Sequence, residues 1–273
     1  MRPALFGFTH LGRETTVSSY TFFVVLAAVV AVGVGVAVAR KRGLDGRRSL
    51  ACLLIGLAAT AVGARLIHWL TNPGSFDGAA SVFSLDRSNL SAFAGLLIGV
   101  PAAAISARKL GVNAWRLADS ATPGLALAAA LARVGCLLNG CCYGQPTQAL
   151  WGAACPAGSN AHAAQMVSGA IGLFDAPLPV HPTQLYEALA ALSGGLIAVW
   201  LLRRKPDDGK VFLVFVIWFT AFRWVNRAFL CTPASFAAPF WLYPAIYVFV
   251  IAVCIHALLL RRSREGGDPP GIP

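Results

Sequence analysis

Seven apolar stretches of roughly 20 residues most constrain how this chain of 273 residues can fold. They cover residues 19–40, 49–70, 90–107, 117–140, 183–203, 211–230 and 239–260. About 20 apolar residues in a helix cross a hydrocarbon core of roughly 30 Å. Hydrophobic residues make up 57% of the chain and charged residues only 12%, which is too little charge to cover a soluble domain. The sequence therefore predicts an all-α polytopic membrane protein with seven transmembrane helices.

The basic residues alternate between the connections that join these stretches. Lys and Arg cluster after the first, third, fifth and seventh stretches, and the connections between these are poor in both: 71–89, 141–182 and 231–238. Because Lys and Arg favour the cytoplasmic side, we expect the N-terminus outside, the C-terminus in the cytoplasm and residues 141–182 in an outer loop. Residues 1–265 then form a single seven-helix membrane domain, and residues 266–273 form a disordered tail.

The formal net charge of +11 does not indicate a nucleic-acid partner. Fifteen of the 22 Lys and Arg residues lie at the predicted cytoplasmic ends, where they fix topology and meet anionic lipid headgroups. Four others lie within the predicted spans: Arg65, Arg133, Arg223 and Arg227. An ionisable side chain inside a membrane span is costly, so each of these arginines is a functional candidate.

The four arginines lie at similar depths in the predicted topology. At 1.5 Å per residue, Arg65 and Arg133 are within about 10 Å of the outer ends of their spans, Arg223 is at a similar depth and Arg227 is shallower. Each arginine could instead extend separately to the outer headgroups, and this alternative stays open for Arg65 and Arg227. A shared anion site in the outer leaflet explains the deeper Arg133 and Arg223 better.

The segment VHPTQLYEAL (180–189) brings further polar groups to the same level. Pro182 suits the first position of a helix, whose free N–H groups and positive dipole end would then face outward. Its polar side chains are His181, Gln184, Tyr186 and Glu187. Glu187 could pair with an arginine or act as a base, and His181 could act as a base or only cap the helix.

Two segments resemble the prolipoprotein diacylglyceryl transferase family. They are HPTQLYEA (181–188) and LADSATPGLALAAALARVGCLLNGCCYGQPT (117–147), and smaller similarities such as GARL (63–66) extend over nearly the whole chain in order. The resemblance implies an enzyme of lipoprotein biosynthesis in the bacterial inner membrane. Such an enzyme moves the diacylglyceryl group of phosphatidylglycerol onto the lipobox cysteine thiol of a prolipoprotein signal peptide, and glycerol phosphate leaves.

The same resemblance implies roles for individual residues. Arg133 and Arg223 would bind the phosphate and stabilise the leaving group. His181, Tyr186 and Glu187 complete the catalytic set, with His181 or Glu187 as the base. The expected substrate-binding residues are Asn139, Gly140, Arg65, Arg227 and Gln184. The resemblance implies no cofactor, and the protein's partners are phosphatidylglycerol, the prolipoprotein and membrane lipids.

The chain also departs from the family pattern. Phe93-Ala94-Gly95 replaces a His-Gly-Gly, and Arg223 is followed four residues later by Arg227 where the family has Glu. A non-catalytic phospholipid-binding relative is therefore one alternative. An anion transporter is another, but only Asp119 and His256 offer ionisable groups in the inner half of the spans.

Seven cysteines are the last notable feature. Two of them, Cys136 and Cys141, replace an amide and a carboxylate of the family pattern. No C-x-x-C is present and no His is suitably spaced, so no metal site is expected. We expect a disulfide from Cys141 or Cys142 to Cys155 in the outer loop. Helix packing by small residues and a reactive thiolate are the alternatives.

Overall fold

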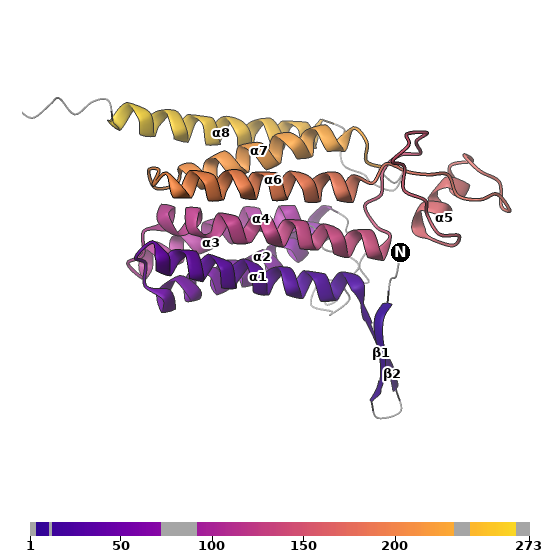
Figure 1. Cartoon of the computed structure of the whole chain (residues 1–273), viewed down its shortest axis with the longest axis horizontal. Coiled ribbons are helices and arrows are strands. Elements are labelled where there is room, and N and C mark those ends of the chain that lie inside the picture. Colours follow the sequence, from indigo (N-terminus) through magenta and orange to yellow (C-terminus); the bar gives the residue numbers. More distant parts are fainter. Residues whose placement is uncertain (1–3, 11–12, 72–91, 232–240, 266–273) are drawn as a thin grey trace, which may run out of the picture.

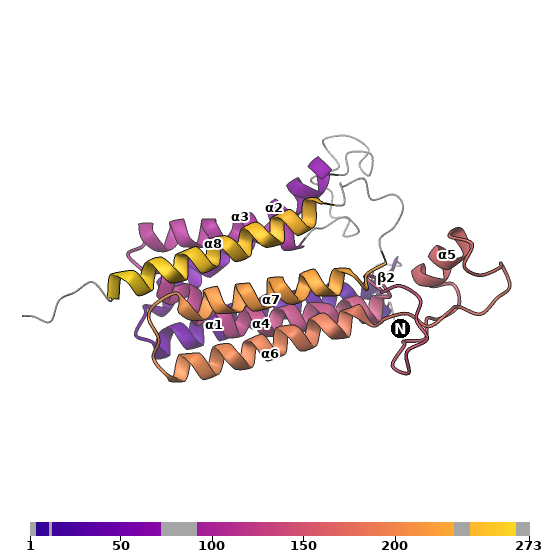
Figure 2. The ribbon, with the colours of Figure 1, turned by 90° about the horizontal axis from the view of Figure 1, so that it is seen from above.

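A bundle of long helices forms the body of the protein (Figure 1). The computed structural model describes residues 4–10, 13–71, 92–231 and 241–265. Its elements are β1 (Ala4–His10), β2 (Arg13–Ser18), α1 (Ser19–Lys41), α2 (Gly46–Thr71), α3 (Ala92–Lys109), α4 (Ala114–Asn139), α5 (Asn160–Val167), α6 (Thr183–Arg203), α7 (Lys210–Arg227) and α8 (Leu242–Glu265). The antiparallel pair β1–β2 and the short α5 both lie beyond the same end of the bundle, called here the loop end (Figures 1 and 2).

The predicted helical membrane fold is confirmed. Five helices are long and apolar enough to cross a membrane: α1, α2 over Gly46–Ile67, α4, α6 and α8 over Leu242–Arg261. The two other predicted spans correspond to α3 and α7, which have 18 residues each and lie in the same bundle. The β1–β2 hairpin was not predicted, and the predicted tail lies outside the described residues.

Small residues let the central helix α4 approach its neighbours closely. A Cβ on Gly124 would lie 2.6 Å from the carbonyl oxygen of Ala31 on α1, and one on Gly195 of α6 would lie 2.8 Å from the Cβ of Ala126. Helices in lipid associate mainly through such close packing, because lipid tails are as apolar as the side chains that they replace. The packing of α4 against α1 and α6 fixes the position of Arg133, near the loop end of α4.

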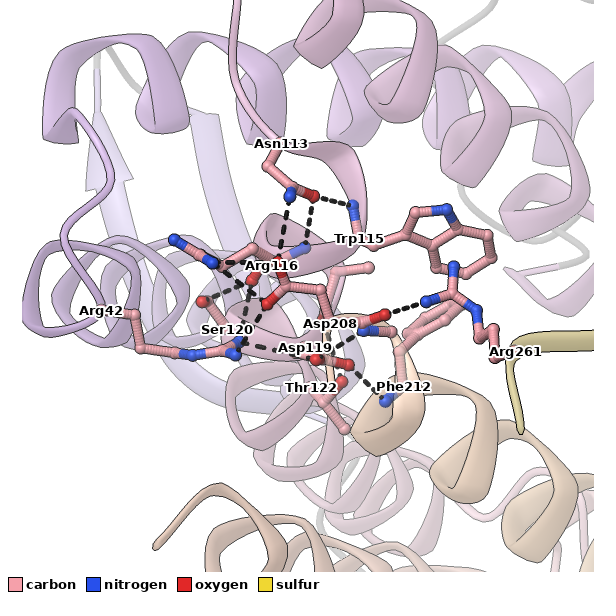
Figure 3. A network of polar contacts seen from close by, with 12 residues as sticks. Arg42, Asn113, Trp115, Arg116, Asp119, Ser120, Thr122, Asp208, Phe212 and Arg261 are labelled. Carbon is pink, nitrogen blue, oxygen red and sulfur yellow. Dashed lines mark hydrogen bonds and ion pairs between the residues drawn. The ribbon is translucent and has the colours of Figure 1, made fainter. Parts of the chain in front are cut away.

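At the opposite end of the bundle, a buried carboxylate from α4 caps α7 (Figure 3). Asp119 is fully buried and accepts hydrogen bonds from the backbone N–H groups of Gly209 at 2.7 Å and Phe212 at 2.9 Å. The first N–H groups of a helix have no partner within that helix, and Gly209 has no side chain to serve as a cap. Asp119 therefore fixes the start of α7 and has a structural role, so the transporter alternative loses one of its two inner-half groups.

Charged side chains connect four segments around this cap (Figure 3). Asp208 forms ion pairs with Arg42 after α1 at 3.2 Å and with Arg116 of α4 at 3.1 Å. Arg261 of α8 donates to the backbone carbonyl of Asp208. Three of the predicted cytoplasmic clusters therefore contribute arginines to one network at this end, called here the basic end.

We expect Asp119→Ala to lower the free energy of unfolding by about 2–3 kcal/mol. Two buried N–H groups lose their acceptor, and Arg42 loses an ion pair of 3.6 Å. Thermal unfolding in detergent measures the effect. The control is Asp207→Ala, which removes an exposed carboxylate from the same loop and should leave the midpoint unchanged. Equal midpoints for the two variants would contradict the capping role.

Candidate active site

Three charged side chains from α4, α6 and α7 meet near the loop end. Glu187 Oε2 lies 2.5 Å from Arg133 Nε and 3.2 Å from Arg223 Nη1. Asn226 Nδ2 donates to the other oxygen of Glu187 at 3.2 Å. Only 8% of the Glu187 side chain is exposed, against 18% for Arg133 and 22% for Arg223. One buried carboxylate therefore holds two guanidinium groups, and we call Arg133, Glu187 and Arg223 the charged triad.

The sequence predicts one depth for Arg133, Arg223 and Glu187, and the structure brings them into direct contact. Arg133 lies six residues before the end of α4, or roughly 9 Å along the axis. Arg223 lies four residues before the end of α7, and Glu187 lies four residues after the start of α6. Two guanidinium groups and one carboxylate carry a formal charge of +1. Such a site suits one further anionic group, because planar guanidinium groups bind phosphate in bidentate fashion.

A second polar group joins α6 to the outer loop. The His181 Nδ1 atom lies 3.2 Å from the hydroxyl of Tyr186, and that hydroxyl accepts a hydrogen bond of 2.8 Å from Trp151 Nε1. A hydroxyl oxygen can accept two hydrogen bonds, so the Nδ1–H of His181 can donate to Tyr186 beside the Trp151 indole, and this tautomer leaves Nε2 of His181 without a proton. The His181 ring also packs against Phe229, with centroids 5.0 Å apart. His181 is therefore held in one orientation at the start of α6.

The loop that follows α4 is fixed by two buried side chains of α6. The Thr183 hydroxyl donates to the carbonyl of Cys142 at 2.7 Å, and Gln184 Nε2 donates to the carbonyl of Cys141 at 2.7 Å. Gln184, which was predicted to bind substrate, holds the backbone of this turn. Asn139 and Gly140, also predicted to bind substrate, line a cavity of about 380 Å³ with residues 156–160.

The cysteine arrangement differs from the predicted disulfide. All seven cysteines are free, and Cys155 packs in the outer loop against Ala161 and Val180. The Sγ atoms of Cys136, Cys141 and Cys142 instead lie within 4.8 Å of one another. Thiol hydrogen bonds from Cys136 and Cys141, followed by the charge of Arg133, hold the pKa of Cys142 below its usual value. Burial raises the pKa of Cys155.

Two predicted arginines lie outside the charged triad. The Arg227 guanidinium stacks on the ring of Tyr243 of α8, 4.2 Å from the centroid. Arg65 lies on α2, which packs against α1 and α3, whereas the triad lies between α4, α6 and α7. The sequence could not separate these arginines from Arg133 and Arg223, because helix depth does not specify which face a side chain occupies.

Two residues that hydrogen-bond to site residues were not predicted from the sequence, namely Asn226 and Trp151. Asn226 is buried and donates both to Glu187 and to the carbonyl of Thr183. It lies three residues after Arg223, a spacing that places both on one helix face and could have identified it. Trp151 reaches Tyr186 from the outer loop, 35 residues away in the chain, and no local pattern predicts that contact.

Comparison with known proteins establishes the family. The family model described as "Prolipoprotein diacylglyceryl transferase" matches residues 7–261. The chain belongs to the prolipoprotein diacylglyceryl transferase family. The charged triad, the His181–Tyr186 pair and the three clustered cysteines all lie within the matched range.

Members of the prolipoprotein diacylglyceryl transferase family from several bacteria are similar to this chain along most of its length. A protein of Leifsonia xyli subsp. xyli is 28% identical over 245 residues, which is 85% of this chain and 70% of the relative. A protein of Paenarthrobacter aurescens is 28% identical over 258 residues, 91% of this chain and 80% of the relative. A protein of Corynebacterium diphtheriae is 26% identical over 267 residues, which is 95% of this chain and 93% of the relative. Each is named phosphatidylglycerol--prolipoprotein diacylglyceryl transferase.

Proposed function

We propose that this chain transfers the diacylglyceryl group of phosphatidylglycerol to the lipobox cysteine of a prolipoprotein and releases glycerol phosphate. The printed names of its relatives support the substrates and the reaction. The observation that carries the proposal is the contact of Arg133 and Arg223 with one carboxylate, Glu187. This contact gathers two guanidinium groups where a lipid phosphate in the outer leaflet would lie.

The charged triad suits the departure of a phosphate ester. Arg133 and Arg223 would bind the phosphate of the donor, and negative charge would increase on its ester oxygen as the glycerol C–O bond breaks. Guanidinium groups already held in position stabilise this charge without reorganising during the reaction. Glu187 holds them together and balances one of their two charges before the lipid binds.

The acceptor thiol must lose its proton, because the thiolate is the nucleophile. The two oxygens of Glu187 are already in contact with Arg133, Arg223 and Asn226, so this carboxylate is not free to reach the acceptor thiol. The His181 ring is held in one orientation at the start of α6 by Tyr186 and Phe229, so we assign the thiol proton to His181. The sulfur then forms the C–S bond, and glycerol phosphate leaves with the electron pair of the C–O bond.

The proposal includes the seven-span topology in the bacterial inner membrane, with the N-terminus outside and the C-terminus in the cytoplasm. The basic end holds Arg42, Arg116 and Arg261, which fits a cytoplasmic surface. The loop end carries residues 141–182, which contain no Lys or Arg. Helices α3 and α7 would be the two further spans. The site would then face the outer leaflet, where the acceptor signal peptide arrives.

We expect Tyr186→Phe to lower kcat by about tenfold and to leave the KM for phosphatidylglycerol unchanged. The substitution removes the hydroxyl that orients His181, and it leaves the charged triad intact. Steady-state release of glycerol phosphate measures both constants. The matched control is Tyr143→Phe, which removes a hydroxyl bonded to the Asn160 carbonyl in the outer loop. A rise in KM alone would show that Tyr186 binds lipid and does not position the base.

The proposed activity is tested with the purified chain in detergent. Phosphatidylglycerol and a lipobox peptide containing Cys should yield glycerol phosphate and a lipidated peptide, whereas the Ser version of the peptide should yield neither. An established family transferase in the same detergent is the positive control. Phosphatidylglycerol binding without release would identify the chain as the non-catalytic relative, and the proposed function would fail.

A further inference from the structure

Three cysteine thiols converge beside the charged triad. Cys136 lies in the last turn of α4, and Cys141 and Cys142 follow its end. Their Sγ atoms all lie within 4.8 Å of one another. The Arg133 Nη1 atom lies 3.8 Å from the Sγ atom of Cys136. The cluster is therefore in contact with a residue of the proposed phosphate site.

The backbone holds these thiols together. Gly140 ends α4 with a φ of 73°, and Cys142 also has a positive φ of 57°. A left-handed conformation is uncommon for a residue with a Cβ and persists only where the surroundings fix it. Thr183 and Gln184 supply that constraint through their bonds to the carbonyls of Cys142 and Cys141. The turn that directs the thiols toward Cys136 is thus anchored to α6.

Three thiolates in this arrangement suit a soft tetrahedral cation. Zn–S bonds of about 2.3 Å place the sulfurs of a tetrahedral site roughly 3.8 Å apart. The largest separation of 4.8 Å need therefore shorten by only about 1 Å, which small rotations of the side chains can provide. Zn²⁺ with three thiolates carries a charge of −1, and the Arg133 guanidinium lies beside it. An N–H donor to a ligand sulfur is also the usual support of such a site.

We propose that Cys136, Cys141 and Cys142 bind one Zn²⁺ ion whose fourth position takes the acceptor thiol. This inference rests on the proposed transferase function. No metal was expected from the sequence, which has no C-x-x-C and no suitably spaced His. Cys141 instead follows Cys136 by five positions, and Cys142 follows Cys141 directly. Cys142 is exposed just after the end of α4, and we place the open fourth position on its side of the cluster.

Coordination would supply the thiolate that the reaction needs. The acceptor thiol displaces a water from the zinc and loses its proton to His181, since a coordinated thiol is deprotonated. Its sulfur then forms the C–S bond to the glycerol carbon, and the C–O bond breaks. Glycerol phosphate leaves with that electron pair and is held by Arg133 and Arg223. The thioether product is a poorer ligand than the thiolate and leaves the zinc.

Cobalt binding to the full chain in detergent under a phosphine reductant tests the metal site. We expect one Co²⁺ per chain, with thiolate charge-transfer absorption in the near ultraviolet that Zn²⁺ abolishes. Cys136→Ser, Cys141→Ser and Cys142→Ser should each weaken binding at least tenfold. Cys155→Ser and Cys231→Ser are the matched controls and should not change it. No charge-transfer absorption, or absorption that survives the triple serine variant, overturns the proposal.

A lipobox peptide added to the cobalt form tests the open position. The Cys peptide should increase the charge-transfer absorption, and the Ser peptide should not. An unchanged spectrum with the Cys peptide would show a closed structural site and overturn the proposed role.

The metal site and the transferase function can be contradicted independently of each other. Equal turnover with and without zinc would contradict the metal inference alone. A cobalt form that binds the Cys peptide, together with a zinc form that releases no glycerol phosphate, would contradict the transferase assignment alone.

Discussion

Arg133→Ala and Arg223→Ala should each lower the rate of glycerol phosphate release by about 10²–10³-fold. This is the usual loss when one preorganised donor to a developing oxyanion is removed. Either variant leaves Glu187 paired with the remaining arginine. Because the buried carboxylate keeps one ion pair, the bundle should still fold. Release of glycerol phosphate measures the rate, and thermal unfolding checks the fold.

The matched control for these variants is Arg204→Ala. The Arg204 guanidinium stacks on Trp200, 4.0 Å from the ring centroid, at the end of α6 remote from the charged triad. Its loss should leave the rate unchanged. Arg133→Lys should recover little activity, because an ammonium keeps the charge but cannot form the bidentate contact. Normal turnover in Arg133→Ala would contradict the assigned role.

Glu187→Gln should lower the free energy of unfolding by about 3–5 kcal/mol, the usual cost of removing one partner from a buried ion pair. Its carboxylate is 8% exposed and holds Arg133 and Arg223 together. Without it two guanidinium groups repel each other in a site with little water. Thermal unfolding in a neutral detergent measures the loss.

Added lipid distinguishes this explanation from a simple packing defect. Phosphatidylglycerol should restore much of the stability of Glu187→Gln, because its phosphate supplies the missing negative charge, whereas phosphatidylcholine should restore little. Asp175→Asn is a control, since it alters a carboxylate in the outer loop that bonds to the Gly172 N–H. Equal rescue by the two lipids would show that the triad does not select an anionic headgroup.

The sequence predicts the helices and the charged triad well, for a physical reason. Apolar length specifies a span, alternating basic residues specify its direction, and the two together give the depth of each polar residue. Arg133, Arg223 and Glu187 agreed in depth, and the structure places them in contact. Span length and charge do not specify the rotation of a helix about its axis. Arg65 and Arg227 were therefore grouped with Arg133 and Arg223, although they lie outside the charged triad.

The remaining features depend on contacts between distant parts of the chain. Asp119 caps a helix that begins 91 residues later, at Lys210, and its own surroundings give no sign of that partner. The cysteine cluster depends on a left-handed turn at Cys142 that two residues of α6 hold in place. No spacing of cysteines in the sequence predicts the cluster, and no local capping pattern predicts the contact of Asp119 with α7.

Native mass spectrometry of the protein with phosphatidylglycerol tests the central claim most directly, namely that Arg133 and Arg223 together bind one phospholipid phosphate. We expect one phosphatidylglycerol to be retained per wild-type chain and per Arg204→Gln chain, and the Arg133→Gln/Arg223→Gln double variant to lose that lipid. Equal retention by the folded double variant and the wild type would show that the headgroup binds elsewhere.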